Sequence, residues 1–146
     1  MSKFSVLIVE DNPIVAMMLE DEVSELGYVV VGPAASEEAA YALAKEHRPS
    51  IALVDIDLDR PQAGVSLAER IYKDFEIDSV YVSGQTSTAD SNCEYVLGLF
   101  EKPVMNEAFT HDLAWLKQLL EDGTPDFEPR SIKLYSRARE LQTQNS

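Results

Sequence analysis

Cysteine and histidine are scarce in this sequence of 146 residues, which has a single cysteine, Cys93, and 2 histidines. One cysteine cannot form an internal disulfide, and no group of Cys and His residues has the spacing of zinc ligands. A chain without disulfides suits a reducing compartment, so we expect a cytoplasmic protein.

Basic residues are scarce as well, because Lys and Arg number 12 against 26 Asp and Glu, for a net charge of -14. Proteins bind the phosphates of nucleic acids mainly through Lys and Arg, so this charge argues against direct contact with nucleic acid. Metal cations and basic protein surfaces are better candidates for partners.

Long apolar runs are also missing. The first run of the chain ends at Glu10, which makes it too short for a signal peptide or a membrane span. We therefore expect neither export nor contact with a membrane.

Five short apolar runs are present, and each predicts a β-strand: residues 4–9, 28–31, 51–56, 79–82 and 97–100. Most are nearly continuous in Val, Ile and Leu instead of alternating with polar residues. This pattern is typical of parallel strands that helices cover on both faces. The length of the chain leaves room for one such domain.

Segments with helical periodicity separate the runs. Asn12 and Ser36 cap the first two helices, and later helices are predicted over 64–75 and 106–121, while 86–96 has only a weak helical pattern. Alternating strands and helices predict a doubly wound α/β fold with a five-stranded parallel sheet, in the flavodoxin-like order 2-1-3-4-5. Ligand sites of such sheets lie at the carboxyl ends of the strands.

Polar and charged residues follow four of these strands: Glu10 and Asp11, Asp55 and Asp57, Ser83, and Lys102. Crowded carboxylates repel one another, which raises their pKa values or requires a cation. A hard divalent ion with oxygen ligands, Mg2+ above all, meets that requirement. A carboxylate nucleophile, a metal, a lysine and a hydroxyl group together are the components of phosphoryl transfer.

Over residues 4–121 the sequence resembles the receiver domain of bacterial response regulators. The segments that carry the resemblance are VLIVEDN at 6–12, ALVDIDL at 52–58, VSG at 82–84 and EKP at 101–103. Each is a weak signal alone, but four in this order, each at a strand end, form a specific one. The resemblance predicts a receiver domain over 1–122 and a separate tail over 123–146.

The resemblance implies that Asp55 accepts a phosphoryl group from a phosphohistidine of a sensor histidine kinase or phosphotransfer protein. Glu10 and Asp11 would then hold Mg2+, together with the Asp55 carboxylate and the backbone carbonyl of Asp57. The chain would signal by a conformational change and by contact with a downstream protein not identified by the sequence. It would not be an enzyme beyond catalysing its own phosphorylation and dephosphorylation.

The same resemblance assigns two further residues to the phosphoryl group: Ser83 would donate a hydrogen bond to it and Lys102 would pair with its charge. The family usually has an aromatic switch residue three positions before this lysine, where this sequence has Leu99, followed by Phe100. Either the switch formed with Ser83 is altered, or a bulge changes the register of the last strand. The segment between Ser83 and Lys102 is also short.

The tail begins with a helix-breaking Gly-Thr-Pro sequence at 123–125 and becomes locally basic. Leu134, Tyr135, Ala138 and Leu141 share a helical stripe. One hypothesis is a short amphipathic helix that docks on its own domain or on a second copy, which leaves a homodimer open. The other is a frayed terminus.

Two other functions stay open at this stage. Phosphatases of the haloacid dehalogenase type also combine an Asp-x-Asp pair, here Asp55 and Asp57, with magnesium and a lysine. Their pair follows the first strand, however, whereas this one follows the third. A pseudo-receiver that is never phosphorylated and only binds a partner is the second alternative, and Leu99 is the residue that favours it.

Overall fold

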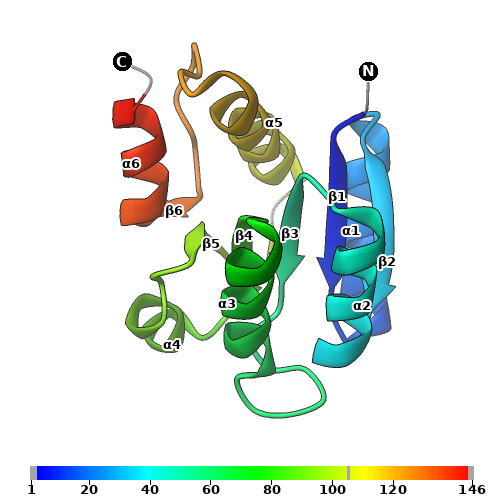
Figure 1. Ribbon diagram of the computed structural model, residues 1–146. Helices are drawn as coiled ribbons and strands as arrows, with labels where there is room; N and C mark the ends of the chain where they lie inside the picture. Colours follow the sequence, from blue (N-terminus) through cyan, green and yellow to red (C-terminus); the bar gives the residue numbers. More distant parts are fainter. Residues whose placement is uncertain (1–2, 105, 145–146) are drawn as a thin grey trace.

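The computed structural model describes residues 3–104 and 106–144 and contains a six-stranded sheet in the order β2-β1-β3-β4-β5-β6 (Figure 1). The strands are β1 (Ser5–Val9), β2 (Val29–Ala34), β3 (Ile51–Val54), β4 (Ser79–Ser83), β5 (Val96–Glu101) and β6 (Lys133–Leu134). The first five pair in parallel, which confirms the predicted order 2-1-3-4-5. The sixth strand was not predicted.

Six helices are present in the described part of the chain: α1 (Pro13–Glu25), α2 (Glu37–His47), α3 (Ala63–Phe75), α4 (Thr86–Ser91), α5 (Asn106–Asp122) and α6 (Ser136–Gln144). Helices α1 and α5 cover one face of the sheet and α2 and α3 cover the other. No helix in the described ranges has both the length and the hydropathy needed to cross a membrane.

Alternate residues of β1 supply the two halves of the core. Val6 and Ile8 pack with residues of α1 and α5, whereas Leu7 and Val9 pack with residues of α2 and α3. All four side chains are buried. Burial on both faces explains why the strands appear in the sequence as nearly continuous apolar runs.

The predicted helix caps are confirmed. The side chain of Asn12 accepts hydrogen bonds from the backbone N–H groups of Ile14 and Val15 at 3.0 and 3.3 Å. Ser36 Oγ accepts one from Ala39 N at 3.2 Å. These bonds satisfy N–H groups that have no partner within the helix, and they fix where each chain segment leaves the sheet edge.

Strand β5 contains a bulge. Ser79 pairs with Val96 and Tyr81 pairs with Leu99, so β5 has one more residue than β4 between these two pairs. The bulge precedes Leu99 and leaves the spacing from Leu99 to Lys102 unchanged. The segment after β4, where the sequence gives only a weak helical pattern, forms the short helix α4.

The tail packs on its own domain. Strand β6 pairs antiparallel with β5, and α6 lies beside α5 at the end of the sheet (Figure 1). Leu134 is part of β6 and Tyr135 precedes α6, so the helix begins later than the stripe of apolar residues in the sequence suggests. Tyr135 and Ala138 are both buried.

Candidate functional site

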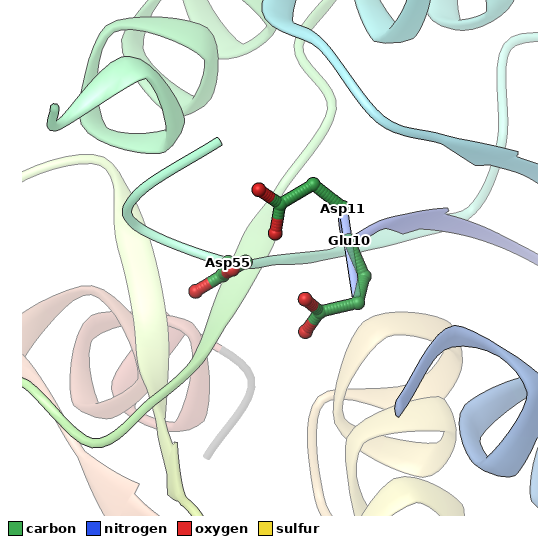
Figure 2. A group of neighbouring side chains, drawn as sticks. All are labelled: Glu10, Asp11 and Asp55. Atoms are coloured by element: carbon green, nitrogen blue, oxygen red, sulfur yellow. The ribbon is translucent and has the colours of Figure 1, made fainter. Parts of the chain in front are cut away.

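Three carboxyl groups meet at the carboxyl ends of two neighbouring strands (Figure 2). Glu10 and Asp11 directly follow β1, and Asp55 directly follows β3. The two strands are parallel, with Val9 beside Val54, and Asp55 N donates a hydrogen bond to Val9 O at 2.9 Å. This pairing brings carboxylate oxygens of the three residues within 4.8 Å of one another.

Burial differs among the three acids. Glu10 is 3% exposed and Asp55 is 9% exposed, whereas Asp11 is open to solvent. The site therefore consists of two buried carboxyl groups and one exposed carboxylate.

Lys102 supplies a positive charge at the same edge. It follows β5, and its Nζ lies 2.8 Å from Glu10 Oε1 and 3.6 Å from Asp55 Oδ1. Its backbone N–H donates a hydrogen bond to Ser83 O at 3.0 Å, which ties the residue to the end of β4. One ammonium thus contacts two of the three carboxyl groups.

The pKa of Asp55 is raised from 3.8 to about 7. Burial is the largest cause and the charge of Glu10 is the next, while Lys102 opposes both. Burial and a neighbouring negative charge both disfavour the ionised carboxylate, whereas a neighbouring ammonium favours it. The site has more negative charge than its lysine neutralises, so its donor set and its electrostatics suit a hard divalent cation.

Ser83 ends β4 and is 2% exposed. Its Oγ accepts a hydrogen bond from Gln85 N at 3.0 Å. The hydroxyl proton remains available to a further acceptor, because the bond uses only an oxygen lone pair. The predicted hydroxyl group is therefore fixed at the carboxyl end of the strand next to β3.

Asp57 directs its carboxylate away from the other three acids. It accepts hydrogen bonds from Gln62 N at 2.8 Å and from Gln85 Nε2. These two bonds, that from Gln62 first, lower the pKa of Asp57. The side chain thus joins the β3–α3 loop to the β4–α4 loop, and it is not part of the carboxylate group. The role predicted for Asp57 concerns its backbone carbonyl instead.

Two residues important for this geometry were not singled out from the sequence. A Cβ atom at Gly64 would lie 1.9 Å from the Asp55 carbonyl oxygen, so only glycine lets α3 approach the Asp55 backbone so closely. Gln85 bonds both Ser83 and Asp57. The position of Gly64 at the start of a predicted helix was a signal that the sequence offered. Nothing in the sequence indicated the role of Gln85.

Leu99 and Phe100 point to opposite faces of β5. Leu99 packs in a cluster with Tyr81, Ala89 and Tyr135, on the side of α4. Phe100 packs against Phe109 of α5, with ring centroids 4.8 Å apart. Of the two candidates for the switch position, only Leu99 therefore lies on the side of α4.

Comparisons with known proteins agree with this geometry. A model of the response regulator receiver domain matches residues 6–110. The phyllosphere-induced regulator PhyR of Methylorubrum extorquens is 35% identical over 79 residues, which are 53% of this chain and 30% of that protein. The transcriptional regulatory protein PdtaR of Mycobacterium tuberculosis is 35% identical over 66 residues, 45% of this chain and 32% of that protein. The chain thus spans about a third of these curated relatives.

Solved structures share the fold. The signal receiver domain of a modulated diguanylate cyclase from Desulfovibrio desulfuricans G20 is 32% identical with a TM-score of 0.67, covering 80% of this chain and 97% of that one. The receiver domain of PhyR from Erythrobacter litoralis is 24% identical with a TM-score of 0.71, covering 87% and 98%. The latter match shows the fold alone. With a family model that covers well over half of its length, the chain belongs to the response regulator receiver domain family.

Proposed function

We propose that the chain is a phosphoacceptor of a two-component system or phosphorelay, and that Asp55 receives the phosphoryl group. The observation that carries the proposal is the arrangement of Asp55 with Glu10, Asp11 and Lys102 at one edge of the sheet. A nucleophilic carboxylate beside further acids and one ammonium is an arrangement that positions a phosphoryl group and neutralises its charge.

In the proposed reaction an Asp55 carboxylate oxygen attacks the phosphorus of a phosphohistidine. The new O–P bond forms as the P–N bond breaks, and the imidazole leaves with the bonding electron pair. The Ser83 hydroxyl donates a hydrogen bond to a phosphoryl oxygen, and Lys102 exchanges part of its contact with Glu10 for the new negative charge. The chemistry ends on the chain's own side chain, so no external product is turned over.

Mg2+ is the proposed cofactor, held by Glu10, Asp11, the Asp55 carboxylate and the backbone carbonyl of Asp57. When bound, it supplies the positive charge that brings a phosphoryl group close to several acids. The pKa of Asp55, raised first by burial and then by the charge of Glu10 against the opposing effect of Lys102, supports this assignment, because a bound cation would stabilise the ionised carboxylate. The protein's own contribution is to hold the carboxyl groups close together, with Glu10 and Asp55 buried.

The partner that we propose is a histidine-bearing helix of a sensor kinase or phosphotransfer protein. Three of the large apolar side chains that the structure leaves exposed lie on α1, next to Asp11: Ile14, Met17 and Met18, at 71%, 59% and 43% exposure. An apolar hollow of about 360 Å³ between α1 and the residues after β5 adjoins them. Such a surface beside the site suits the apolar face of a helix.

Incubation with acetyl phosphate or phosphoramidate and Mg2+, followed by intact mass, tests the proposal. Wild type should gain one phosphoryl group, Asp55→Asn should gain none, and chelation of Mg2+ should prevent the gain. Asp21→Asn, a substitution of an exposed acid on α1, is the matched control and should behave as wild type. Equal phosphorylation of the Asp55→Asn variant would refute the assignment.

The two alternatives predict other outcomes. A phosphatase of the haloacid dehalogenase type would turn over a small phosphoester such as p-nitrophenyl phosphate, with the second acid of the pair free to transfer protons. Here hydrogen bonds from Gln62 and Gln85 occupy the Asp57 carboxylate, which disfavours that role. A pseudo-receiver would take no phosphoryl group from any donor. If the chain does accept a phosphoryl group, a panel of purified histidine kinases would identify the cognate kinase as the one that phosphorylates it fastest.

A further inference from the structure

The tail is held on the domain by a turn that the sequence does not reveal. Asp112 of α5 is 0% exposed and accepts hydrogen bonds from the backbone N–H groups of Arg130, Ser131 and Ile132 at 2.6 to 2.8 Å, and from Ser131 Oγ. A buried carboxylate with four donors is a strong anchor. It fixes the chain where the tail turns back toward β5.

Strand β5 has a glycine at the position where the tail pairs with it. Gly98 pairs with Leu134, and a Cβ atom at Gly98 would lie 2.5 Å from the carbonyl oxygen of Lys133 and 3.1 Å from Ile132. Any other residue at this position would push the tail away. The tail is therefore an integral part of this receiver's surface.

A second carboxylate joins the tail to α4. Asp90 Oδ1 accepts a hydrogen bond from the Tyr135 hydroxyl at 2.9 Å, and Asp90 Oδ2 lies 2.7 Å from Lys133 Nζ. We call these two contacts the Asp90 clasp. Because one side chain of α4 makes both contacts, a displacement of α4 acts on both at once.

The tyrosine of the clasp is part of a buried apolar cluster of the domain. Tyr135 is 6% exposed and packs in one cluster with Leu99, Tyr81 and Ala89. Ile56, which follows Asp55, belongs to the same cluster. The tail thus supplies an aromatic ring beside Leu99, on the side of the sheet where α4 lies.

Helix α4 is linked directly to the proposed phosphorylation site. It has six residues and begins at Thr86, two positions after Gly84 and three after Ser83, and no side chain caps its N-terminus. Gln85, at its start, bonds Ser83 Oγ through its backbone and Asp57 through its side chain. A change at Ser83 therefore passes to Asp90 through one short helix.

We propose that the tail is coupled to the phosphorylation site through the Asp90 clasp, so that phosphorylation of Asp55 loosens β6 and α6. The inference rests on the proposed function. Phosphorylation draws the Ser83 hydroxyl toward the phosphoryl oxygens, α4 moves with it, and Asp90 leaves its position opposite Tyr135 and Lys133. By linkage, a tail that is already loose makes the phosphorylated state easier to form.

Hydrogen exchange on the full-length chain tests the coupling. The protein is kept phosphorylated with excess acetyl phosphate and Mg2+, and intact mass on the same sample gives the phosphorylated fraction. Amide exchange over 133–144 should become about tenfold faster, the factor expected when one or two ordinary hydrogen bonds are lost. Exchange over α1 should not change, and Asp55→Asn with the same donor should show no increase.

The single tryptophan gives a second readout. Trp115 is 2% exposed and belongs to the same core cluster as Ile132 and Ala138 of the tail. Its emission should shift to the red when the tail loosens. A phosphorylated sample with unchanged tail exchange and unchanged emission would overturn the inference and leave the proposed function intact. A chain that takes no phosphoryl group would overturn both.

Substitutions of the two residues that contact Asp90 test the clasp itself. Tyr135→Phe removes only the hydroxyl that bonds Asp90, and Lys133→Ala removes the other contact. The double variant should show faster tail exchange before phosphorylation, a smaller further increase after it, and a higher phosphorylated fraction at limiting donor. Arg139→Gln, a change of an exposed tail residue, should behave as wild type. A double variant with the wild-type increase and fraction would show that the clasp carries no coupling.

Discussion

Replacement of Asp55 by asparagine should stabilise the metal-free protein above neutral pH, although it removes the proposed phosphoacceptor. The pKa of Asp55 is raised from 3.8 to about 7, first by burial and then by Glu10. The folded chain therefore binds a proton that the unfolded chain releases. Stability falls as pH rises through this range, and it levels off once the folded carboxyl group is ionised too.

The magnitude follows from the two pKa values. A difference between 3.8 and about 7 corresponds to about 4 kcal/mol of free energy of unfolding, at about 1.36 kcal/mol for each pH unit. The Asp55 side chain keeps some contact with solvent, at 12% exposure, and water screens part of the cost. We expect about 2 kcal/mol at pH 8, or about 4–8 °C in the melting temperature of a chain of this size.

Urea denaturation of wild type and Asp55→Asn from pH 4 to pH 8.5, with a chelator present, measures this effect. The advantage of Asp55→Asn should be close to zero near pH 4, grow up to about pH 7 and stay constant above it. Asp21→Asn should show no such dependence. A pH-independent difference, or an Asp55→Asn variant less stable than wild type at pH 8, would refute the electrostatic reasoning.

Three further predictions concern other charged groups. Mg2+ should raise the melting temperature of wild type, and Asp11→Asn should require at least about tenfold more Mg2+ for the same rise, because it removes one carboxylate of the donor set. Lys102→Ala should still accept some phosphoryl groups by intact mass but leave tail exchange unchanged, because the phosphoryl group loses the ammonium that positions it. Asp112→Ala should lower the free energy of unfolding by about 3 kcal/mol in urea, because it leaves several buried N–H groups without an acceptor. Asp126→Ala, a change of an exposed acid on the same connection, should be close to neutral.

The strands and their order could be predicted because burial on both faces leaves a strong signal in the sequence. Val6 to Val9 and Ile51 to Val54 are apolar at every position, and all are buried. Once the order is known, the carboxyl ends of β1 and β3 must be neighbours. The meeting of Glu10, Asp11 and Asp55 follows from that rule, without knowledge of any side-chain contact.

Contacts between distant segments could not be predicted in the same way. A strand of two residues such as β6 is too short to show alternation, so its pairing with β5 leaves no pattern. Glu37 resembled an ordinary acid in the first turn of a helix, but it is 2% exposed and bonds Ser66 and Arg70 at 2.7 and 2.8 Å, as well as Arg60. Partners 23 to 33 residues away determine its burial, and no local rule includes them.

The bulge in β5 shows why the side of the sheet on which Leu99 lies needed the structure. A bulge after Leu99 would have placed a different residue on the side of α4, but the register shift lies before it. Leu99 therefore keeps the position three residues before Lys102, without an aromatic ring. Tyr135 of the tail brings a ring and a hydroxyl group to the same cluster.

Gly64 and Gly98 each mark a place where this chain requires close backbone contact, and neither has a positive φ. Gly64 lets α3 approach the carbonyl of Asp55, and Gly98 lets the tail approach β5. The atom nearest to the Cβ position of each glycine is a backbone carbonyl oxygen, which cannot yield as the end of a flexible side chain can. The proposed phosphorylation site and the tail are thus both built with little room for adjustment, and the proposed coupling relies on packed elements that pass on a displacement instead of absorbing it. Helix α4, short and without a side-chain cap, is the element that links them, through Gln85 at its start and through Asp90.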